Sequence, residues 1–452
     1  MNCFPGSERL HSKIFYLQRI GLDFKTIQNN KKRVKVMHEN IVAAPELAGE
    51  GLQKIEWVRR NMPILRKIQS EFEKEQPFAG KRITVCIHLE AKTAFLALVL
   101  RSGGAQVSVT GSNPESTKDD VVAALAEEGL RVYARHGAEP SEMRKYMEMA
   151  LDLKPHLVID DGGDLVEILH ETRTDLLEGM LGACEETTTG VLRAQARAKA
   201  AQLQFPVMLV NEARCKYLFD NVHGTGQSVW DAVMRSTNLV LAGKTVVVAG
   251  YGWCGRGCAL RAQGMGASVI VCEVDPVKAC DALMNGCRVM PLMEACKEAD
   301  VVLSVTGVRH TIRKEHFKVL KDNALLANAG HFWEEIDVEG LSGMSKDRKQ
   351  MRTNVEGFLL QDGRWLNLLG NGNIVNIACA DGHPAEIMDT SFALQALSAQ
   401  HLVQQEKQLA NRCYPVPERI DQRVAQIRLE SSGVSFDTLT EDQQQYLSGW
   451  DA

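Results

Sequence analysis

The chain has 452 residues, enough for two or three domains, and its 45% hydrophobic and 24% charged residues are ordinary for a globular protein. The net charge of −5 gives no reason to expect a nucleic-acid partner, and the sequence offers no membrane span. Twelve cysteines are scattered singly, which indicates reduced thiols and a cytoplasmic protein.

The first 36 residues are basic and irregular, with the run Lys31–Lys35 shortly before Met37. They lack the apolar core of a signal peptide. Two interpretations stay open: a transit segment, or a flexible tail with Met37 as an alternative start. We therefore set residues 1–40 apart as an irregular N-terminal segment.

The next segment alternates between helical and strand patterns. Residues 51–74 have the apolar spacing of an amphipathic helix, and Pro63 inside them predicts a kink or two helices. Apolar runs then predict strands at 83–89, 105–110, 157–160 and 205–210, with helices at 94–101 and 120–129. This alternation predicts a parallel, doubly wound α/β sheet.

A glycine-rich turn follows the β-branched run 245–249. It has the pattern Gly250-x-Gly252-x-x-Gly255, and a helical stretch and a second strand ending at Glu273 come after it. Gly250 permits the tight turn, Gly252 lets the backbone approach a pyrophosphate, and Gly255 allows close packing of helix and strand. The helix N-terminus offers unpaired N–H groups to the anion. Glu273 stands where an acceptor for the ribose diol belongs, which favours NAD over NADP.

A second series of strands starts at this turn, at 245–249, 267–272, 301–305 and 324–328. We therefore expect two Rossmann-like domains joined by a hinge, with functional groups at the carboxyl ends of the strands. The apolar stretch 390–402 predicts a long helix that packs back on the first domain, and 439–442 begins a short capped helix. The expected domains are 41–222 plus 384–430 for the substrate, 223–383 for NAD, and a C-terminal segment 431–452.

Polar clusters stand where strands should end, which indicates a nicotinamide site surrounded by acid–base groups. They lie at 88–93, 160–164, 185–190, 211–221, 330–331 and 381–383. Lys216 and Asp220 are four residues apart, so a helix places them on one face, and a lysine beside an aspartate can be tuned toward general-base work. The histidines lack ligand spacing, so we expect no metal. These features alone indicate a dehydrogenase.

Eight motifs occur together in this chain: Asp160–Asp164, Glu185–Gly190, Lys216 with Phe219–Asn221, Gly224–Ser228, Ala249–Gly252, Glu273–Pro276, Asn328–Phe332 and Gly382–Pro384. With them the sequence resembles the S-adenosyl-L-homocysteine hydrolase family over essentially all of residues 45–450. The resemblance implies a hydrolase of the methyl cycle in one-carbon metabolism, assembled as a homotetramer or homodimer.

The reaction implied by the resemblance is a hydrolysis hidden behind a redox cycle. Bound NAD oxidises the ribose 3′-hydroxyl, C4′–H becomes acidic, and the 5′ thioether leaves by elimination. Water then adds and the ketone is reduced, which releases L-homocysteine and a purine nucleoside. By position, the resemblance implies that Asp161 is the base at C4′, that Lys216 and Asp220 assist the oxidation, that Glu186 holds the ribose hydroxyls, and that His88 and His331 handle protons on the 5′ side.

The resemblance also implies two sets of binding residues. The expected NAD contacts are Thr187, Thr188, Thr189, Asn221, Gly250, Gly252, Gly255, Glu273, Thr306, Asn328 and Asn376. The expected substrate contacts are Glu90, Lys92, Thr93, Asp381 and His383.

The substrate cluster departs from the common family form, in which Glu90 is a Thr, Lys92 is a Glu or Gln, and Asp381 is a Met or Thr. Adenine offers a 6-amino donor that suits an acceptor, whereas Lys92 has only donors and suits the 6-oxo group of hypoxanthine. Asp381 either pairs with Lys92, which leaves adenine readable by other groups, or accepts N1–H of hypoxanthine. The substrate is thus S-adenosyl- or S-inosyl-L-homocysteine, the latter used by some members of a short-tailed archaeal and thermophile-type branch.

The C-terminus departs too, because the sequence ends at Trp450-Asp451-Ala452 without the tail Lys and Tyr of the common form. We therefore expect either looser NAD binding or preferred loading of the reduced cofactor, and the absence of the tail weakens the argument for a tetramer. Two alternative functions stay open: a nucleoside 3′-oxidoreductase paralogue, and an inactive regulatory homologue. Asp161 and the two histidines argue against the first. Lys216 and its acidic neighbours argue against the second.

Overall fold

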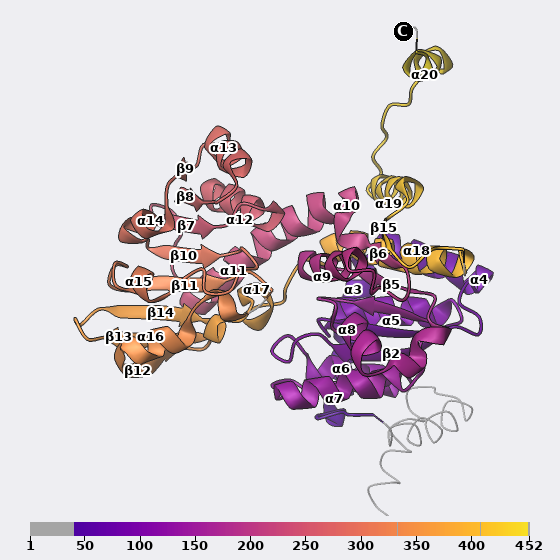
Figure 1. Ribbon diagram of the computed structural model, residues 1–452, viewed down its shortest axis with the longest axis horizontal. Coiled ribbons are helices and arrows are strands. Elements are labelled where there is room, and N and C mark those ends of the chain that lie inside the picture. Colours follow the sequence, from indigo (N-terminus) through magenta and orange to yellow (C-terminus); the bar gives the residue numbers. More distant parts are fainter. Residues whose placement is uncertain (1–39, 332, 407, 451–452) are drawn as a thin grey trace, which may run out of the picture.

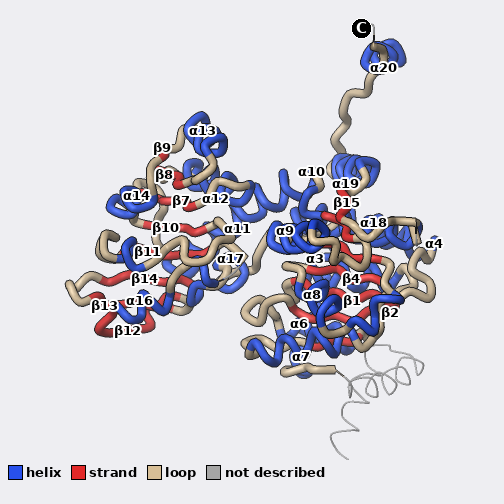
Figure 2. The backbone as a smooth tube through the Cα atoms, viewed as in Figure 1, coloured by secondary structure: helices blue, strands red, loops and turns tan. Residues whose placement is uncertain are grey.

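The computed structural model describes residues 40–450 except 332 and 407, and shows two lobes, each built on its own sheet (Figure 1). The interpretations of residues 1–36 lie outside the described residues. Strands fill the middle of each lobe and helices cover them (Figure 2). Among the described helices, none combines the length and apolar character that a bilayer crossing requires.

The first lobe contains a seven-stranded parallel sheet in the order β15-β6-β5-β4-β1-β2-β3. Its strands are β1 (Arg82–Ile87), β2 (Gln106–Gly111), β3 (Arg131–Tyr133), β4 (Leu157–Asp160), β5 (Gly182–Glu185), β6 (Val207–Leu209) and β15 (Cys413–Pro415). Its helices are α3 (Ala48–Arg60), α4 (Pro63–Glu75), α5 (Ala91–Ser102), α6 (Asp119–Glu127), α7 (Pro140–Leu151), α8 (Asp164–Glu171), α9 (Thr188–Lys199), α18 (Ala385–Gln404) and α19 (Glu418–Ser431).

The second lobe contains an eight-stranded sheet in the order β12-β13-β14-β11-β10-β7-β8-β9. Its strands are β7 (Thr245–Ala249), β8 (Ser268–Cys272), β9 (Arg288–Val289), β10 (Val301–Ser304), β11 (Ala324–Asn328), β12 (Ser345–Arg352), β13 (Val355–Leu360) and β14 (Trp365–Leu369). Its helices are α11 (Thr225–Thr237), α12 (Trp253–Gly264), α13 (Pro276–Met284), α14 (Leu292–Glu298), α15 (Lys314–Phe317), α16 (Val338–Met344) and α17 (Val375–Ala378). The predicted pair of Rossmann-like domains is confirmed.

One edge of the second sheet differs from the expected parallel order. Strands β12, β13 and β14 pair antiparallel. The turns between them are too short for a crossover helix, and two of their residues, Asn354 and Gly363, have positive φ angles of 64° and 94°. Local turn chemistry therefore overrides the parallel pattern at this edge.

Several other predicted elements are confirmed. The break at Pro63 separates α3 from α4, because proline begins a helix well but cannot continue one. The long helix α18 starts after Pro384 and packs on α4, α5 and α19 of the first lobe. The predicted C-terminal helix is α20 (Glu441–Ser448), capped by Thr440, and it projects away from both lobes (Figure 1).

We propose domain boundaries at 41–222 plus 384–430 and at 223–383, with 431–452 as a separate segment. The first range supplies every strand of the seven-stranded sheet, and the second supplies every strand of the eight-stranded sheet. The chain crosses between the lobes twice, before α11 and before α18. Both crossings carry polar residues of the site described below.

Buried Asp389 joins α18 to α4 across the first lobe. Its two carboxylate oxygens accept hydrogen bonds from Ile64 N and Leu65 N, at 2.9 and 2.8 Å. These are N–H groups of the first turn of α4, which have no partner inside their own helix. A carboxylate from a distant helix therefore caps α4.

Removal of this cap should destabilise the protein. Asp389→Ala leaves two buried N–H groups without acceptors, so we expect the free energy of unfolding to fall by about 2–4 kcal/mol in a denaturant titration. Asp275→Ala is the matched control, because Asp275 caps α13 at an exposed position and its loss should cost about 1 kcal/mol or less. Equal losses in the two variants would contradict this account of Asp389.

Candidate active site

The segment that carries Lys216 is a short α-helix, α10 (Arg214–Lys216), that runs into a π-helix, η5 (Tyr217–Gly224). A π-helix is wider than an α-helix and often marks a functional site. Here it brings residues four and five positions after Lys216 beside its ammonium group. Lys216 Nζ lies 3.3 Å from Asp220 Oδ1 and donates to Asn221 Oδ1 at 2.9 Å. The predicted shared face of Lys216 and Asp220 is confirmed.

Glu186 joins this group from the loop between β5 and α9, with its Oε1 3.5 Å from Lys216 Nζ. All three ionisable residues are at most 5% exposed. Burial opposes the charge of Lys216, but Asp220 and Glu186 outweigh it and raise its pKa. Burial raises the pKa of Glu186 to about 7, although Lys216 acts in the opposite direction. The predicted tuning of Lys216 toward a neutral base is therefore not favoured here: two carboxylates hold it as an ammonium ion.

A chain of amides links Lys216 to the predicted NAD contacts. Asn221 Nδ2 donates to Asn211 Oδ1 at 3.3 Å, and Asn211 Nδ2 donates to Thr188 Oγ1 at 3.1 Å. Thr187 caps α9, since its Oγ1 accepts from Gly190 N. The threonine run thus begins helix α9. Two amide side chains, those of Asn211 and Asn221, link Thr188 to Lys216 and so to the lysine cluster, by which we mean Lys216, Asp220 and Glu186.

Asp161 lies at the carboxyl end of β4 and is 1% exposed. Its Oδ2 accepts from Ser112 Oγ at 2.8 Å and lies 3.5 Å from His88 Nε2. Its Oδ1 has no hydrogen-bond partner among the described residues. His88 is oriented by Ser116, whose Oγ lies 2.7 Å from Nδ1. The structure therefore brings the predicted C4′ base and one predicted 5′ proton carrier together.

His331 reaches the same place from the second lobe. A Cβ built on Gly162 would lie 2.7 Å from His331 Nε2, so the two lobes approach closely beside Asp161. Burial opposes ionisation of Asp161, but His88 and His331 together lower its pKa. Burial lowers the pKa of His88, against the pull of Asp161. At neutral pH this geometry favours an ionised Asp161 beside a neutral His88.

Two further carboxyl groups lie where β4 and β5 end, and the sequence did not indicate that they position the loops that follow. Asp160 and Glu185 are paired residues of β4 and β5. Asp160 accepts from Asp161 N and Val166 N, and Glu185 Oε1 accepts from Gly162 N and Thr187 N. Burial raises the pKa of Asp160 to about 8 and also raises that of Glu185. This pair fixes the backbone of both polar loops.

The predicted base-reading residues form a second charged group at the start of α5. Lys92 Nζ lies 3.0 Å from Glu90 Oε2 and donates to the backbone oxygen of Asp381 at 3.0 Å. The Asp381 carboxylate instead turns outward, to Arg235 at 3.2 Å, and is 84% exposed. Of the two alternatives for Asp381, pairing of its carboxylate with Lys92 is not what the structure shows, because Glu90 is the nearer carboxylate; acceptance of N1–H of hypoxanthine stays a prediction. Thr93 Oγ1 donates to the backbone oxygen of His88.

His383 lies at the second crossing between the lobes. Its Nδ1 is 2.8 Å from Asp220 Oδ1, and its Nε2 is 3.2 Å from Thr225 Oγ1. Both ring nitrogens therefore face polar atoms of the first crossing. This histidine ties the two crossings to each other and to the lysine cluster.

The glycine turn of the second lobe has the geometry that a dinucleotide requires. Gly250 has φ of 100°, and a Cβ on Gly255 would lie 2.1 Å from the Gly250 backbone oxygen. Gly252 has open space where a Cβ would point, so its backbone is approachable. Glu273 Oε2 accepts from Tyr251 N at 2.7 Å, which holds the predicted ribose acceptor against the turn. These residues fit a pyrophosphate and a ribose diol.

Of the remaining predicted NAD contacts, Thr306 and Asn328 lie at the ends of β10 and β11, and Asn376 lies in α17. Asn376 Nδ2 donates to Ser228 Oγ, while its buried Oδ1 has no partner in the described part of the chain and suits an amide donor of a ligand. Asn328 bonds Gly372 O and Gly330 N. Thr306 is held by Glu335: its backbone N–H and its hydroxyl both donate to the carboxylate of Glu335. Glu335 was not predicted as a site residue, because no motif in the sequence around it indicates a functional role.

Glu335 is 1% exposed and organises the whole loop after β10. Its Oε2 accepts from Ser304 Oγ and Thr306 N, and its Oε1 accepts from Gly307 N at 2.7 Å. One carboxylate thus satisfies several polar groups of a loop at the carboxyl end of a strand.

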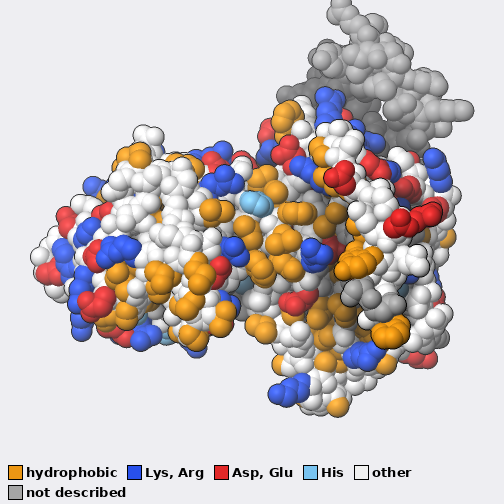
Figure 3. Space-filling view, turned by 90° about the horizontal axis from the view of Figure 1, so that it is seen from above, with side chains coloured by type: hydrophobic (Ala, Val, Ile, Leu, Met, Phe, Trp, Pro, Cys, Tyr) orange, Lys and Arg blue, Asp and Glu red, His pale blue; other side chains and the backbone are white. Residues whose placement is uncertain are grey.

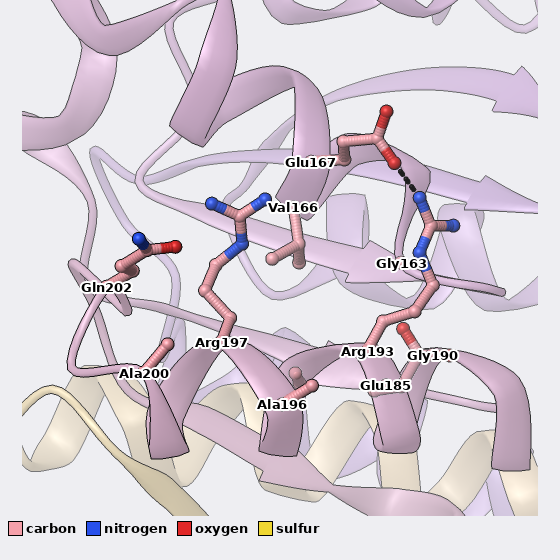
Figure 4. Close-up of a pocket in the computed structure, with 11 residues that line it drawn as sticks. Gly163, Val166, Glu167, Glu185, Gly190, Arg193, Ala196, Arg197, Ala200 and Gln202 are labelled. Atoms are coloured by element: carbon pink, nitrogen blue, oxygen red, sulfur yellow. Dashed lines mark ion pairs between the residues drawn. The ribbon is translucent and has the colours of Figure 1, made fainter.

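Seen from above, hydrophobic side chains gather around the narrow middle of the molecule, between the two lobes (Figure 3). A separate cavity opens between α8 and α9 and does not include Asp161 or Lys216 (Figure 4). The guanidinium of Arg193 pairs with Glu167, and that of Arg197 pairs with Glu171. We therefore assign no ligand to this cavity.

The fold and the site define an NAD-dependent enzyme in which a Rossmann domain is paired with a second α/β domain that carries acid–base groups. The chain belongs to the S-adenosyl-L-homocysteine hydrolase family, whose family model matches residues 39–175 and whose NAD-binding-domain model matches residues 221–382. It is thus a hydrolase that uses NAD.

Curated relatives cover nearly the whole chain. An adenosylhomocysteinase of Pyrococcus abyssi is 52% identical over 89% of this chain and 96% of its own length. An adenosylhomocysteinase of Thermotoga maritima is 51% identical over 88% and 99%. An S-inosyl-L-homocysteine hydrolase of Methanothermobacter thermautotrophicus is 48% identical over 90% and 97%.

The role of Glu335 is testable through NAD affinity. In Glu335→Gln an NH₂ group replaces one acceptor of the Thr306 loop, so we expect NAD to bind about tenfold more weakly in a fluorescence titration. Glu334→Gln is the matched control, because Glu334 is more exposed and pairs only loosely with Arg309, at 3.7 Å. Unchanged NAD affinity in Glu335→Gln would show that the loop does not depend on this carboxylate.

Proposed function

We propose that this chain hydrolyses the thioether of S-adenosyl-L-homocysteine and S-inosyl-L-homocysteine, releasing L-homocysteine and a purine nucleoside. The observation that carries the proposal is the buried Asp161 carboxylate, which has one oxygen without a partner among the described residues and lies beside His88. When bound at the glycine turn, NAD would supply reversible oxidation of the 3′-carbon and so acidify C4′–H. Each remaining part of the reaction is assigned to side chains of this chain.

Asp161 would take the C4′ proton. Its lowered pKa keeps it ionised at neutral pH, and its unpartnered Oδ1 is the atom available to accept the proton. His88 would take over the C4′ proton from Asp161, donate it as imidazolium to the departing sulfur and, neutral again, take a proton from the water that adds at C5′. Its Nε2 is 3.5 Å from Asp161, so one small site serves both proton transfers.

The lysine cluster would hold the ribose hydroxyls. The Lys216 ammonium would bind the 3′-oxygen and stabilise negative charge there, and Asp220 would keep the lysine in place. Glu186, with a pKa of about 7, would accept the hydroxyl hydrogen bonds and is the base best matched to neutral pH. An oxidoreductase that stops at the 3′-ketone would not need Asp161 and His88.

The pair Lys92 and Glu90 would read the purine edge. It offers one donor next to one acceptor, 3.0 Å apart. Hypoxanthine presents an acceptor at O6 and a donor at N1, and adenine presents a donor at the 6-amino group and an acceptor at N1. Either base therefore finds complementary partners in one of two registers, so we propose that both substrates are accepted.

Thiol release from each substrate tests this proposal. NAD-loaded enzyme should release homocysteine from both, at kcat/KM values within about tenfold of each other, since each base satisfies both groups. Lys92→Glu should shift the ratio toward the adenosyl substrate by about tenfold or more, because the two N–H groups of the 6-amino group can bind two acceptors, whereas O6 of hypoxanthine would face a carboxylate and lose its donor.

Arg235→Ala is the control for charge, since Arg235 pairs with the outward carboxylate of Asp381, and it should leave the ratio unchanged. Efficient turnover of the adenosyl substrate alone by the unaltered enzyme would contradict base reading by Lys92.

We also propose that the chain forms a homotetramer or homodimer in the cytoplasm. The C-terminal arm that includes α20 leaves Phe436, Tyr446, Leu447 and Trp450 more than half exposed. Contiguous exposed apolar side chains usually mark a surface that another chain covers. The eleven cysteines of the described residues are free thiols, which suits a reducing compartment.

Light scattering on the whole chain tests the assembly. We expect a dimer or tetramer for the unaltered protein, and a smaller species for a chain that ends at residue 432, because the arm would then be missing. The control changes a polar residue of the same arm, Gln444→Ala, which should leave the mass unchanged because the apolar side chains of the arm are kept. A monomeric unaltered protein would contradict the proposal.

A further inference from the structure

Helix α18 presents two polar side chains to the lysine cluster, although its sequence is largely apolar. Ser391 Oγ donates to Asp220 Oδ2 at 2.6 Å, and Gln395 Nε2 donates to Glu186 Oε2 at 2.5 Å. Ser391 and Gln395 are four residues apart, so they lie on one face of the helix. Both are fully buried, which leaves no water to replace either hydrogen bond.

In both carboxylates, one oxygen faces Lys216 and the other accepts a hydrogen bond from α18. Asp220 and Glu186 each turn one oxygen to Lys216 Nζ, at 3.3 and 3.5 Å. The other oxygen of each carboxylate accepts from α18. Rotation of either carboxylate would therefore break a contact with the lysine and a buried hydrogen bond together, and a buried polar group left unpaired is costly.

We propose that Ser391 and Gln395 are positioning residues of this site, which act through Asp220 and Glu186 to hold the lysine cluster in the geometry that binds the ribose hydroxyls. The inference rests on the proposed function of that cluster.

The position of α18 gives this arrangement a second consequence. The helix begins at Ala385, two residues after His383, whose Nδ1 also contacts Asp220 Oδ1. Three side chains of the second crossing and of α18, those of His383, Ser391 and Gln395, thus bind the two carboxylates. Any displacement of α18 relative to the first crossing would change the partners of Asp220 and Glu186.

Gln395 has a particular effect on protonation. Burial, Asp220 and Asp161 raise the pKa of Glu186, whereas Lys216 and the Gln395 hydrogen bond lower it. A variant that loses the Gln395 donor keeps the raising influences, so the pKa of Glu186 rises further. Because the carboxylate is the form that accepts ribose hydroxyls, activity would be lost on the acidic side and kept at higher pH.

The test compares Gln395→Met and Ser391→Ala with Ser398→Ala. Ser398 is the matched control: it is equally buried on the same helix, and its hydroxyl has no hydrogen-bond partner in the part of the chain that the structure describes. The readout is the absorbance of reduced nicotinamide when NAD-loaded protein is mixed with adenosine or inosine, followed from about pH 5.5 to 9.5. Thermal unfolding of each variant is measured alongside.

We expect Gln395→Met to move the acidic midpoint of this profile upward by about one pH unit, the shift that loss of one charge-assisted hydrogen bond produces. Ser391→Ala should lower the amplitude or the rate of the absorbance change about tenfold. The loss should be the same at all pH values, because Lys216 and His383 still lower the pKa of Asp220. Ser398→Ala should match the unaltered protein.

A Gln395→Met profile that coincides with that of Ser398→Ala would overturn the inference. If Gln395→Met does not fold, Gln395→Glu replaces it, and its added carboxyl should move the midpoint upward by more than about one unit. The proposed function is judged separately, by thiol release from the unaltered protein. If the unaltered protein released no thiol, the proposed function would fail, but the pH profile of the nicotinamide absorbance would still test whether Ser391 and Gln395 position the lysine cluster.

Discussion

One buried ammonium ion shared by two carboxylates is the interaction on which this site depends. Lys216 lies within 3.5 Å of both Asp220 and Glu186, and all three are removed from water. Removal of Lys216 would leave two carboxylates without their cation inside the protein, which is strongly unfavourable. The surroundings therefore secure each partner: the π-helix brings Asn221 to the lysine, α18 binds both carboxylates, and His383 contacts Asp220.

The structure separates two chemical tasks within one site. The lysine cluster offers cationic and acceptor groups suited to ribose hydroxyls, whereas Asp161 and His88 form a smaller acid–base pair at the end of β4. One carboxylate of each group, Glu186 and Asp161, lies on a loop whose backbone is fixed by Asp160 and Glu185. His331 from the second lobe reaches the Asp161 side, so the second lobe contributes a side chain to the proposed elimination site.

Much of the fold and part of the site follow from local sequence patterns. The glycine turn, the break at Pro63 and the shared face of Lys216 and Asp220 depend on residues close in sequence, so they could be predicted. Glu335, Ser391 and Gln395 act over 28 to 209 positions and have no local signature. The sequence could not decide between the two alternatives for Asp381, because the direction of its side chain depends on which charged partner is nearer, and the sequence does not give the positions of Glu90, Lys92 and Arg235 in space.

The central claim is that oxidation and elimination are carried out by separate groups, and the variant Asp161→Asn tests it most directly. Mixed with S-adenosyl-L-homocysteine, NAD-loaded Asp161→Asn should still show the absorbance of reduced nicotinamide, because the lysine cluster is intact. It should release homocysteine about a hundredfold or more slowly than the unaltered enzyme, since the C4′ base is lost. Thiol release at the unaltered rate would contradict the account.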